Sequence, residues 1–312
     1  MDAILRYGSD KPDLRFDLQL VTLAEEVNHY NVVGLNGKNL GGKLTSKYVS
    51  YLNKLAVDVG AKRLFILTRD ASTILPKETI PLEKSTIVQS LDLSDDDVGL
   101  IAVGRGLTPF LALGKVRHEI INDFYIDADK QNTFYFSWVV NFPLFEKTDD
   151  CLEPMHHPFT APVDEDIELL DKNPEVVRAK AYDLVLNGWE IAGGSIRNHK
   201  RAIQEKIFEL LGYSKTEYTA LFGFLLDALS FGAPPHGGLA FGFDRFISTL
   251  KGRTSIRDVI AFPKNRAFRC LVTDAPSKVS PDQLDEPRGH WCSDQQCRSP
   301  FPFLASFLFR LS

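Results

Sequence analysis

Two short segments hold the residues with the clearest chemical potential: 182–199, YDLVLNGWEIAGGSIRNH, and 232–245, GAPPHGGLAFGFDR. The first contains the carboxylates of Asp183 and Glu190 together with Arg197, and the second ends on an Asp-Arg pair. Two carboxylates in one site repel each other unless a cation lies between them. Oxygen ligands of this kind suit Mg²⁺ that bridges nucleotide phosphates. These residue types therefore predict a pocket for a triphosphate, a divalent metal and a small acid.

A β-hairpin is expected to position the two carboxylates. Asn187-Gly188 is a strong signal for a type I′ turn, which needs positive φ at both central residues. Side chains alternate between the faces of a strand, so Asp183 and Glu190 are predicted to share one face with Val185. The two-residue loop predicts the following cross-strand pairs: Leu186 with Trp189, Val185 with Glu190, and Asp183 with Ala192.

Arg197 lies an odd number of residues after Glu190, so a regular strand would direct it to the opposite face. The segment 192–194, Ala-Gly-Gly, is where a β-bulge could absorb one residue and return the arginine to the carboxylate face. A surface hairpin with solvated charges is the alternative, and the second segment argues against it.

The second segment predicts a strand that leads into a helix. Residues 239–243 are typical of a buried strand, and an apolar helical face follows, formed by Phe243, Phe246, Ile247 and Leu250. Asp244 and Arg245 then fall in the first helical turn, where backbone N–H groups favour a phosphate. A structural Asp-Arg pair is the alternative. The loop 232–238 predicts either the floor of an adenine slot or a tight turn.

Six segments in order resemble the aspartyl-tRNA synthetases of bacterial and organellar type, which are class II aminoacyl-tRNA synthetases. They are RYGSDKPDLRF (6–16), WVVNFPLFE (138–146), MHHPFTAP (155–162), 182–199, FGFLLDALSFGAPPHGGLAFGFDR (222–245) and SIRDVIAFPK (255–264). The resemblance anchors nearly everything from residue 1 to about 276. It implies an α+β fold, namely an incomplete class II catalytic domain (an antiparallel sheet flanked by helices) with an inserted α+β domain.

The resemblance also implies an activity: ATP-dependent activation of L-aspartate to aspartyl-adenylate, then transfer to tRNA(Asp) by a homodimer in the complete enzyme. Asp183 and Glu190 match the family's Mg²⁺–ATP carboxylates. Arg197 matches the arginine that holds the substrate's side-chain carboxylate, and His156 matches a histidine that contacts aspartate. The third signature motif, which binds ATP and whose arginine grips the phosphates, corresponds to Gly242, Phe243, Asp244 and Arg245. Arg197, Glu190 and Arg245 are thus the expected catalytic residues.

The His156-His157 pair has a second interpretation as a metal site. Adjacent histidines are expected to point apart, and no cysteine or acidic partner lies at ligand spacing, so substrate contact is favoured. Ala192 departs from the family pattern, which usually has glycine there, and this affects the expected direction of Arg197.

The family's enzymes contain a domain and two signature motifs that are not recognised in this sequence. An anticodon-binding OB barrel and the first two signature motifs are not found, and the second of these supplies an arginine for the α-phosphate. Loss of such a group removes about 3 kcal/mol or more of transition-state stabilisation. The chain alone is therefore expected to be an inactive fragment of the ligase.

Four parts are predicted along the chain: 1–16 follows the second motif, 17–131 is the inserted α+β domain, 132–276 is catalytic domain with the third motif, and 277–312 is a tail. The tail loses resemblance from Pro287, as expected for intron read-through or, second, a real extension. Its His290, Cys292 and Cys297 are a weak zinc signal, and its apolar run 301–311 is too short to span a bilayer.

The composition allows two domains with an ample core: 312 residues, of which 44% are hydrophobic. A net charge of −5 argues against non-specific nucleic-acid binding but does not exclude tRNA. Four cysteines without pairing logic indicate a reducing compartment. No signal or transit peptide is recognised, and the expected location is the mitochondrial matrix or another organelle in a eukaryote, or the cytoplasm in a bacterium.

Two other functions remain open. One is a non-catalytic paralogue or truncated product that binds nucleotide or tRNA, against which the retained Asp183, Glu190, Arg197 and Arg245 argue. The other is an asparaginyl or lysyl relative, which the predicted inserted domain and the Gly-Ser-x-Arg arginine disfavour.

Overall fold

The computed structural model describes residues 1–27, 29–70, 73–75, 82–148 and 151–277. The chain divides into two compact units, 1–256 and 257–312. A 3₁₀ helix, Ile256–Asp258, spans the boundary, and a β-bridge between Lys264 and Cys270 follows in the second unit. The atypical tail from Pro287 and its zinc candidates fall outside the described residues, and the predicted domain boundaries stay predictions.

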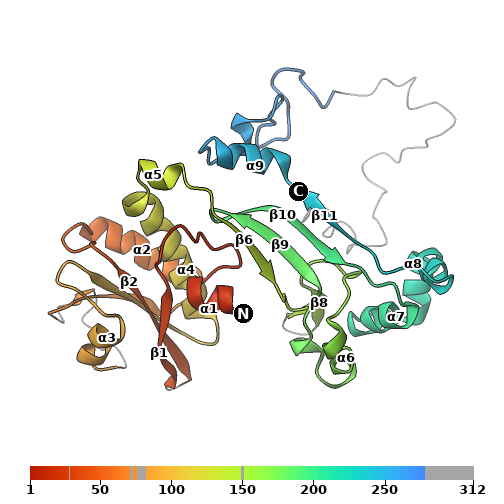
Figure 1. Cartoon of the computed structure of the whole chain (residues 1–312), viewed down its shortest axis with the longest axis horizontal. Helices are drawn as coiled ribbons and strands as arrows, with labels where there is room; N and C mark the ends of the chain where they lie inside the picture. The colour runs from red at the N-terminus through yellow and green to blue at the C-terminus, as the bar shows by residue number, and fades with distance from the viewer. Residues whose placement is uncertain (28, 71–72, 76–81, 149–150, 278–312) are drawn as a thin grey trace, which may run out of the picture. The chain divides into compact units, whose positions relative to one another are not determined.

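The first part of the larger unit is built on a five-stranded antiparallel sheet (Figure 1). Its strands, in spatial order, are β1 (Leu20–Val27), β2 (Tyr30–Gly37), β5 (Val98–Gly104), β3 (Arg63–Thr68) and β4 (Thr73–Leu75). The helices of this part are α1 (Asp2–Tyr7), α2 (Ser46–Asp58), α3 (Lys84–Ser90), α4 (Thr108–Ile120) and α5 (Ala128–Gln131), with a π turn at Ile121–Tyr125.

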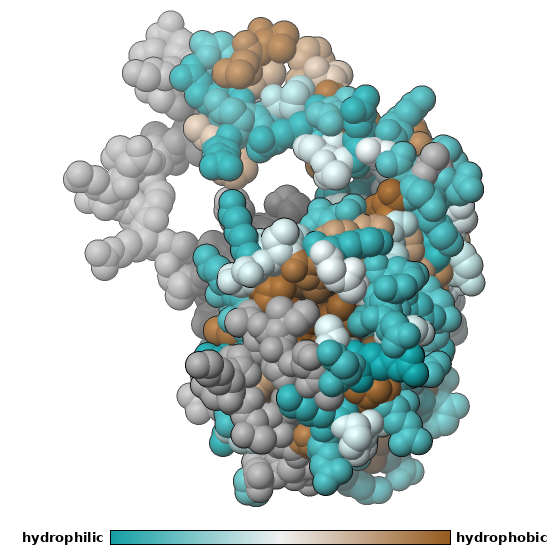
Figure 2. Space-filling model, turned by 90° about the vertical axis from the view of Figure 1, so that its left-hand side faces the viewer, coloured by the Kyte–Doolittle hydropathy of each residue, from teal (hydrophilic) through white to brown (hydrophobic). Residues whose placement is uncertain are grey.

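Helices cover both faces of this sheet. α2 and α4 pack on one face, and α3 packs on the other around Ile87. α4 buries Leu113, Val116 and Ile120, whereas Leu111 is 38% exposed. The neighbouring Phe110 and Ala112 are buried instead, because α4 lies deep between the sheet and α1. The side of the molecule in Figure 2 is mostly hydrophilic, with hydrophobic residues in small separate groups.

The second part of the unit holds a four-stranded antiparallel sheet, so the predicted antiparallel sheet flanked by helices is confirmed. Its strands, in spatial order, are β11 (Gly237–Phe241), β10 (Trp189–Ile196), β9 (Ala181–Leu186) and β6 (Phe136–Val140). Accompanying elements are the hairpin of β7 (Phe145–Lys147) and β8 (Leu152–Pro154), helices α6 (Leu169–Lys172), α7 (Arg201–Leu210), α8 (Lys215–Ser230) and α9 (Phe243–Leu250), and 3₁₀ turns at Asp164–Asp166 and Pro174–Val176.

Local signals specify the two longer helices. α7 buries Ile207 and packs partly buried Ile203 and Leu210 against the same core, together with Leu211, which follows the helix. Gly212, with φ of 86°, comes next, and a capping box of Ser214 and Glu217 begins α8. Across the described residues we find no helix long and apolar enough to cross a membrane.

The two faces of the four-stranded sheet differ. Pairing places Ser137, Val139, Asp183 and Val185 on one face, which we call the carboxylate face. The other, which we call the open face, carries apolar side chains that are each about half exposed: Phe136, Trp138, Val140, Leu239 and Phe241. The prediction that 239–243 forms a buried strand is therefore wrong. The strand is β11, which ends at Phe241 and pairs only with β10, and its residues are exposed although Phe246 of α9 packs edge-on against Phe241.

Candidate active site

The site begins at the hairpin of β9 and β10, whose turn adopts the predicted conformation. Asn187 and Gly188 have φ of 50° and 86°, as a type I′ turn requires. The Asn187 amide also fixes the hairpin to the chain before β6, because Nδ2 donates to the Thr133 carbonyl at 2.8 Å and Oδ1 accepts from the Tyr135 N–H at 2.9 Å. The turn is thus anchored as well as shaped.

The predicted pairs Leu186–Trp189 and Val185–Glu190 are confirmed, but the predicted pairing of Asp183 with Ala192 is wrong. The bulge falls between Glu190 and Ala192, one step earlier than expected. Gly193 therefore pairs with Asp183, and Ala192 pairs with Leu184 and Phe241, on the open face. The side chain of Ala192 consequently points away from the carboxylate face.

The bulge places Gly193, rather than Ala192, opposite Asp183 on the carboxylate face. A Cβ atom on Gly193 would lie 2.7 Å from Asp183 Oδ1 and 3.0 Å from Glu190 Oε1, so both carboxylates lie over this glycine. Asp183 is 6% exposed, whereas Glu190 is exposed. Burial and the negative charge of Glu190 raise the pKa of Asp183 to about 6. Two converging carboxylates, with the pKa of Asp183 raised, describe a site that is short of positive charge.

Lys11 supplies part of that charge. Its Nζ lies 2.9 Å from Glu190 Oε2. The ion pair with Glu190 and the nearby charges of Asp10 and Asp183 outweigh partial burial and raise the pKa of Lys11. We assigned no role to this lysine from the sequence, although it lies in the block 6–16. The one feature that could have identified it is its position between Asp10 and Pro12, in a segment for which no helix or strand is predicted.

Arg197 returns to the carboxylate face, because Gly193, Ser195 and Arg197 alternate on the same side after the bulge. Its backbone pairs with His236 and bridges Thr160, so the main chain is fixed on both sides. The Nη1 atom of Arg197 is buried and has no hydrogen-bond partner among the described residues. A buried guanidinium nitrogen without an acceptor is costly, and a carboxylate ligand would satisfy it.

The two histidines have different surroundings. His156 packs edge-on against Phe142, with centroids 4.5 Å apart, and the charges that act on it come from Glu190, Asp10 and Lys11. Desolvation dominates and lowers its pKa. His157 packs against Phe159, and burial followed by the charge of Arg197 lowers its pKa to about 4. The charge of Glu190 therefore acts on His156, and the charge of Arg197 acts on His157.

Arg245 lies in the first turn of α9, as predicted, after the N-cap residue Gly242. Its guanidinium is 4.5 Å from the ring centroid of Trp189, the residue before Glu190. Trp189 and Glu190 alternate between faces, so this stacking brings Arg245 to the hairpin end of the sheet but does not place it between the carboxylates. Phe243 and Asp244 in the same turn are exposed.

The donor set suits magnesium shared with a ligand. No group of three or more His, Cys, Asp or Glu side chains placed for a metal occurs in the described part of the chain. Two carboxylates over a bare glycine, however, are what Mg²⁺ needs when phosphates and waters supply the remaining oxygens. Asp183 and Glu190 would hold such an ion.

A family model for the class II tRNA synthetases (D, K and N) matches residues 1–266 of the chain. The chain belongs to this family.

Curated members of the class II family are similar over most of the chain. It is 43% identical to an aspartate–tRNA(Asp/Asn) ligase of Desulfatibacillum aliphaticivorans over 304 residues, covering 91% of this chain and 50% of that protein. It is 41% identical to an aspartate–tRNA ligase of Lysinibacillus sphaericus, covering 91% of this chain and 51% of that protein. The chain thus spans about half the length of these relatives.

Solved structures of the class II family overlap less. An aspartyl-tRNA synthetase from Entamoeba histolytica gives a TM-score of 0.33 at 22% identity, over 49% of this chain and 26% of its own. A score this low carries no argument about the site.

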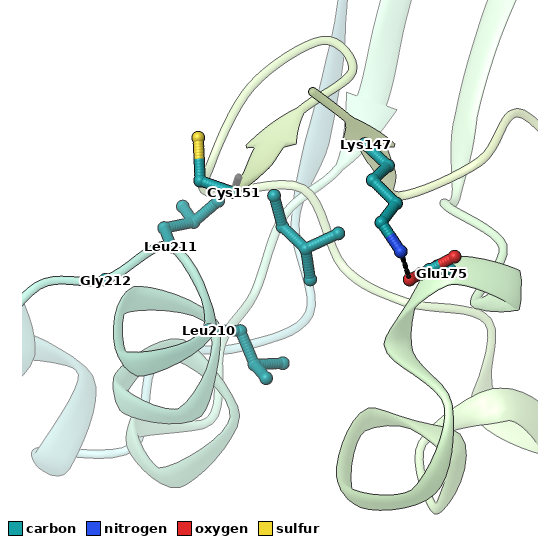
Figure 3. Close-up of a pocket in the computed structure, with 7 residues that line it drawn as sticks. Lys147, Cys151, Glu175, Leu210, Leu211 and Gly212 are labelled. Carbon is teal, nitrogen blue, oxygen red and sulfur yellow. Dashed lines mark hydrogen bonds and ion pairs between the residues drawn. The ribbon is translucent and has the colours of Figure 1, made fainter. Parts of the chain in front are cut away.

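One hollow of this class II chain lies away from the carboxylates. It is lined by Lys147, Cys151, Leu152, Glu175, Leu210, Leu211 and Gly212, between the β7–β8 hairpin and the end of α7 (Figure 3). Lys147 and Glu175 form an ion pair at 2.6 Å on its rim. It contains none of the predicted site residues.

Proposed function

We propose that this chain is the catalytic part of an aspartate–tRNA ligase, which activates L-aspartate with ATP and Mg²⁺ and transfers it to tRNA(Asp). The supporting observation is the carboxylate face, where Asp183 and Glu190 converge over Gly193 and Arg197 carries an unpaired buried nitrogen. The names of the relatives, aspartate–tRNA ligase and aspartate–tRNA(Asp/Asn) ligase, support the same substrate class.

In this proposal, the residues act by positioning and charge. Arg197 would hold the side-chain carboxylate of aspartate, since a guanidinium forms a rigid fork that an amide substrate cannot match. His156 would contact the amino acid from the side of Glu190, close to its place beside Phe142. An oxygen of the α-carboxylate of the bound aspartate would then attack the α-phosphate of ATP in line and displace pyrophosphate, a step that depends on orientation.

Asp183 and Glu190 would hold Mg²⁺, which neutralises phosphate charge during the attack. Arg245 would leave its stacking on Trp189 to grip the phosphates, and Gly242, Phe243 and Asp244 would shape the ATP site around it. Homodimer formation, the contacts with tRNA(Asp) and the location in an organelle or in the bacterial cytoplasm would be properties of the whole protein. We propose them from the resemblance to aspartate–tRNA ligases.

The first test is binding of a non-hydrolysable aspartyl-adenylate analogue to the full chain by calorimetry with Mg²⁺. The unpaired Nη1 predicts that Arg197→Leu weakens binding by about a hundredfold, as expected when a charge-assisted bidentate contact is lost. ATP affinity should be unchanged. Arg69→Leu removes an exposed arginine paired with Asp95 and serves as the matched control.

Equal affinity of the Arg197→Leu variant and wild type for the analogue would remove the aspartate assignment. Aspartate-dependent exchange of pyrophosphate into ATP then separates an active ligase from a chain that binds the ligand without activating it.

A further inference from the structure

The segment that carries Lys11 to the carboxylates is held from behind by helix α4. This segment, residues 9–18, which we call the Lys11 strap, runs from α1 to β1 and contains no helix or strand. At its middle, Lys11 forms its ion pair with Glu190. At its end, Phe16 and Leu18 are buried in the core beneath α2 and α4. The position of Lys11 therefore depends on what fixes the strap.

Arg117 of α4 is the main attachment. It is 3% exposed, and its described hydrogen bonds all reach backbone carbonyls of the strap. Nε donates to Leu18 at 2.6 Å, and Nη2 donates to Asp13 at 2.7 Å and to Phe16 at 3.2 Å. Burying a guanidinium is unfavourable unless its donors are satisfied, so an arginine that only filled space here would be replaced by an apolar residue at little cost.

A glycine contact fixes the start of the strap. Gly8 caps α1 with φ of 68°, and a Cβ atom there would lie 2.5 Å from Gly114 Cα. In return, a Cβ atom on Gly114 would lie 2.0 Å from the Gly8 carbonyl oxygen. The backbones of α1 and α4 therefore touch at a point that admits no side chain on either residue. This contact lies one turn from Arg117 on the same helix.

The opposite side of the strap rests on the site hairpin. A Cβ atom on Gly188 of the turn would be 3.4 Å from Asp13 Cβ and 3.8 Å from the Lys11 carbonyl oxygen. Asp13 is itself fixed by Arg15, whose Nη2 lies 2.6 Å from Oδ2, while Nη1 of Arg15 donates to the Lys130 carbonyl. The strap is thus enclosed between α4 and the hairpin that carries Glu190.

We propose that α4 positions Lys11 at the carboxylate pair, with Arg117 and Gly114 as positioning residues that act only through the strap. This inference rests on the proposed function for its effect on aspartate binding, but the attachment itself can be measured without any ligand.

The ligand-free test is competitive acylation of lysines in the full chain, read by mass spectrometry. Lys11 should react slowly because it is paired, and exposed Lys115 on the same helix is the internal reference. In Arg117→Met we expect the Lys11 rate relative to Lys115 to rise about threefold or more, with a smaller rise in Arg117→Lys.

Gly114→Ala should act in the same direction without removing a charge. Gly223→Ala is its matched control, because an added Cβ in α8 would meet only Thr219 Cγ2 at 3.5 Å. Ile87→Val, in the core on the other face of the sheet, controls for general loss of stability. An unchanged Lys11 rate in Gly114→Ala and the folded Arg117 variants would overturn the proposal, as would an equal rise in Ile87→Val.

The ligand test is a double-mutant cycle with the aspartyl-adenylate analogue. If Arg117 acts only through Lys11, Lys11→Met and Arg117→Met each weaken binding, and the double variant binds no more weakly than Lys11→Met alone. A merely structural arginine would give additive losses and overturn the proposal. If wild type does not bind the analogue, the proposed function fails, while the acylation rates still decide whether α4 holds the strap.

Discussion

At the scale of single residues, the site is defined by a charge imbalance. Asp183 and Glu190 lie beside one lysine, Lys11, the charge of Arg197 acts on His157, and Arg245 stacks on Trp189. Ligand phosphate, carboxylate and metal would together balance these groups. The carboxyl of Asp183 should therefore report whether a cation is bound.

We predict that Asp183 makes the unliganded chain less stable as the pH rises. Its pKa is raised to about 6 in the folded chain, so its contribution is greatest below the unfolded pKa near 4 and is lost as pH rises through 6. Relative to Asp183→Asn, wild type should lose on the order of 2 kcal/mol of unfolding free energy between pH 4 and 7. Urea unfolding of both proteins at each pH measures this difference.

Saturating Mg²⁺ with ATP should abolish that pH dependence in wild type and leave Asp183→Asn unaffected. If the difference between the two proteins does not vary with pH, the carboxylates do not share the crowded site that the hairpin indicates.

Sequence reasoning at this scale identified the carboxylate pair and the return of Arg197, because the Asn-Gly turn fixes the first two cross-strand pairs. The predicted position of the bulge, within 192–194, was wrong by one residue, since small residues there do not indicate where a bulge forms. Lys11 was missed because its partner is distant in sequence, and no periodic pattern connects an irregular strap to a hairpin.

At the scale of elements, the adjacent glycines Gly193 and Gly194 of β10 are required for different reasons. Gly193 leaves room for the carboxylates, whereas a Cβ atom on Gly194 would lie 1.9 Å from the Gly238 carbonyl oxygen of β11. The first conflict involves the ends of side chains, and the second involves the backbone of a paired strand.

We therefore expect Gly193→Ala to change the unfolding free energy by less than about 1 kcal/mol but to weaken Mg²⁺-dependent ATP binding by about tenfold or more. Gly194→Ala should instead cost about 2 kcal/mol or more of stability, because the β10–β11 pairing must separate. Urea midpoints and calorimetry with Mg²⁺–ATP distinguish them. Equal loss of ATP binding at equal stability in both variants would contradict this division.

The elements themselves were largely predictable where their signals are local. The capping box at Ser214, the apolar face of α7 and the Asn-Gly turn all specify structure within a few residues. Burial was less predictable, because an apolar strand such as β11 is buried only if another element covers it. A strand was correctly predicted at 239–241, but its exposure depends on the rest of the chain.

At the scale of the whole molecule, the open face is the feature that the sequence did not anticipate. Trp138 is 57% exposed and Phe241 is 48% exposed, on a sheet that pairs with no further described strand at β6 or β11. Relatives of about twice this length contain residues that the chain does not match. Exposed apolar sheet faces favour association in water.

We expect the chain to self-associate with increasing concentration and the variant Trp138→Lys/Leu239→Lys to remain monomeric, as measured by light scattering after gel filtration. Phe231→Lys, which removes a 92% exposed phenylalanine outside the open face, is the control. Equal association of all three proteins would show that the open face is not responsible.

The bulge between Glu190 and Ala192 has a consequence for how this sequence can change over time. Gly193, Ser195 and Arg197 reach the carboxylate face only because Ile191, at the bulge, has no cross-strand partner on β9. Losing or gaining a single codon between the turn and Arg197 would reverse every later side chain at once. We expect members of this family to vary the residue types in this hairpin while keeping its number of residues fixed. Alignments of the family should therefore contain no insertions or deletions between the turn and Arg197.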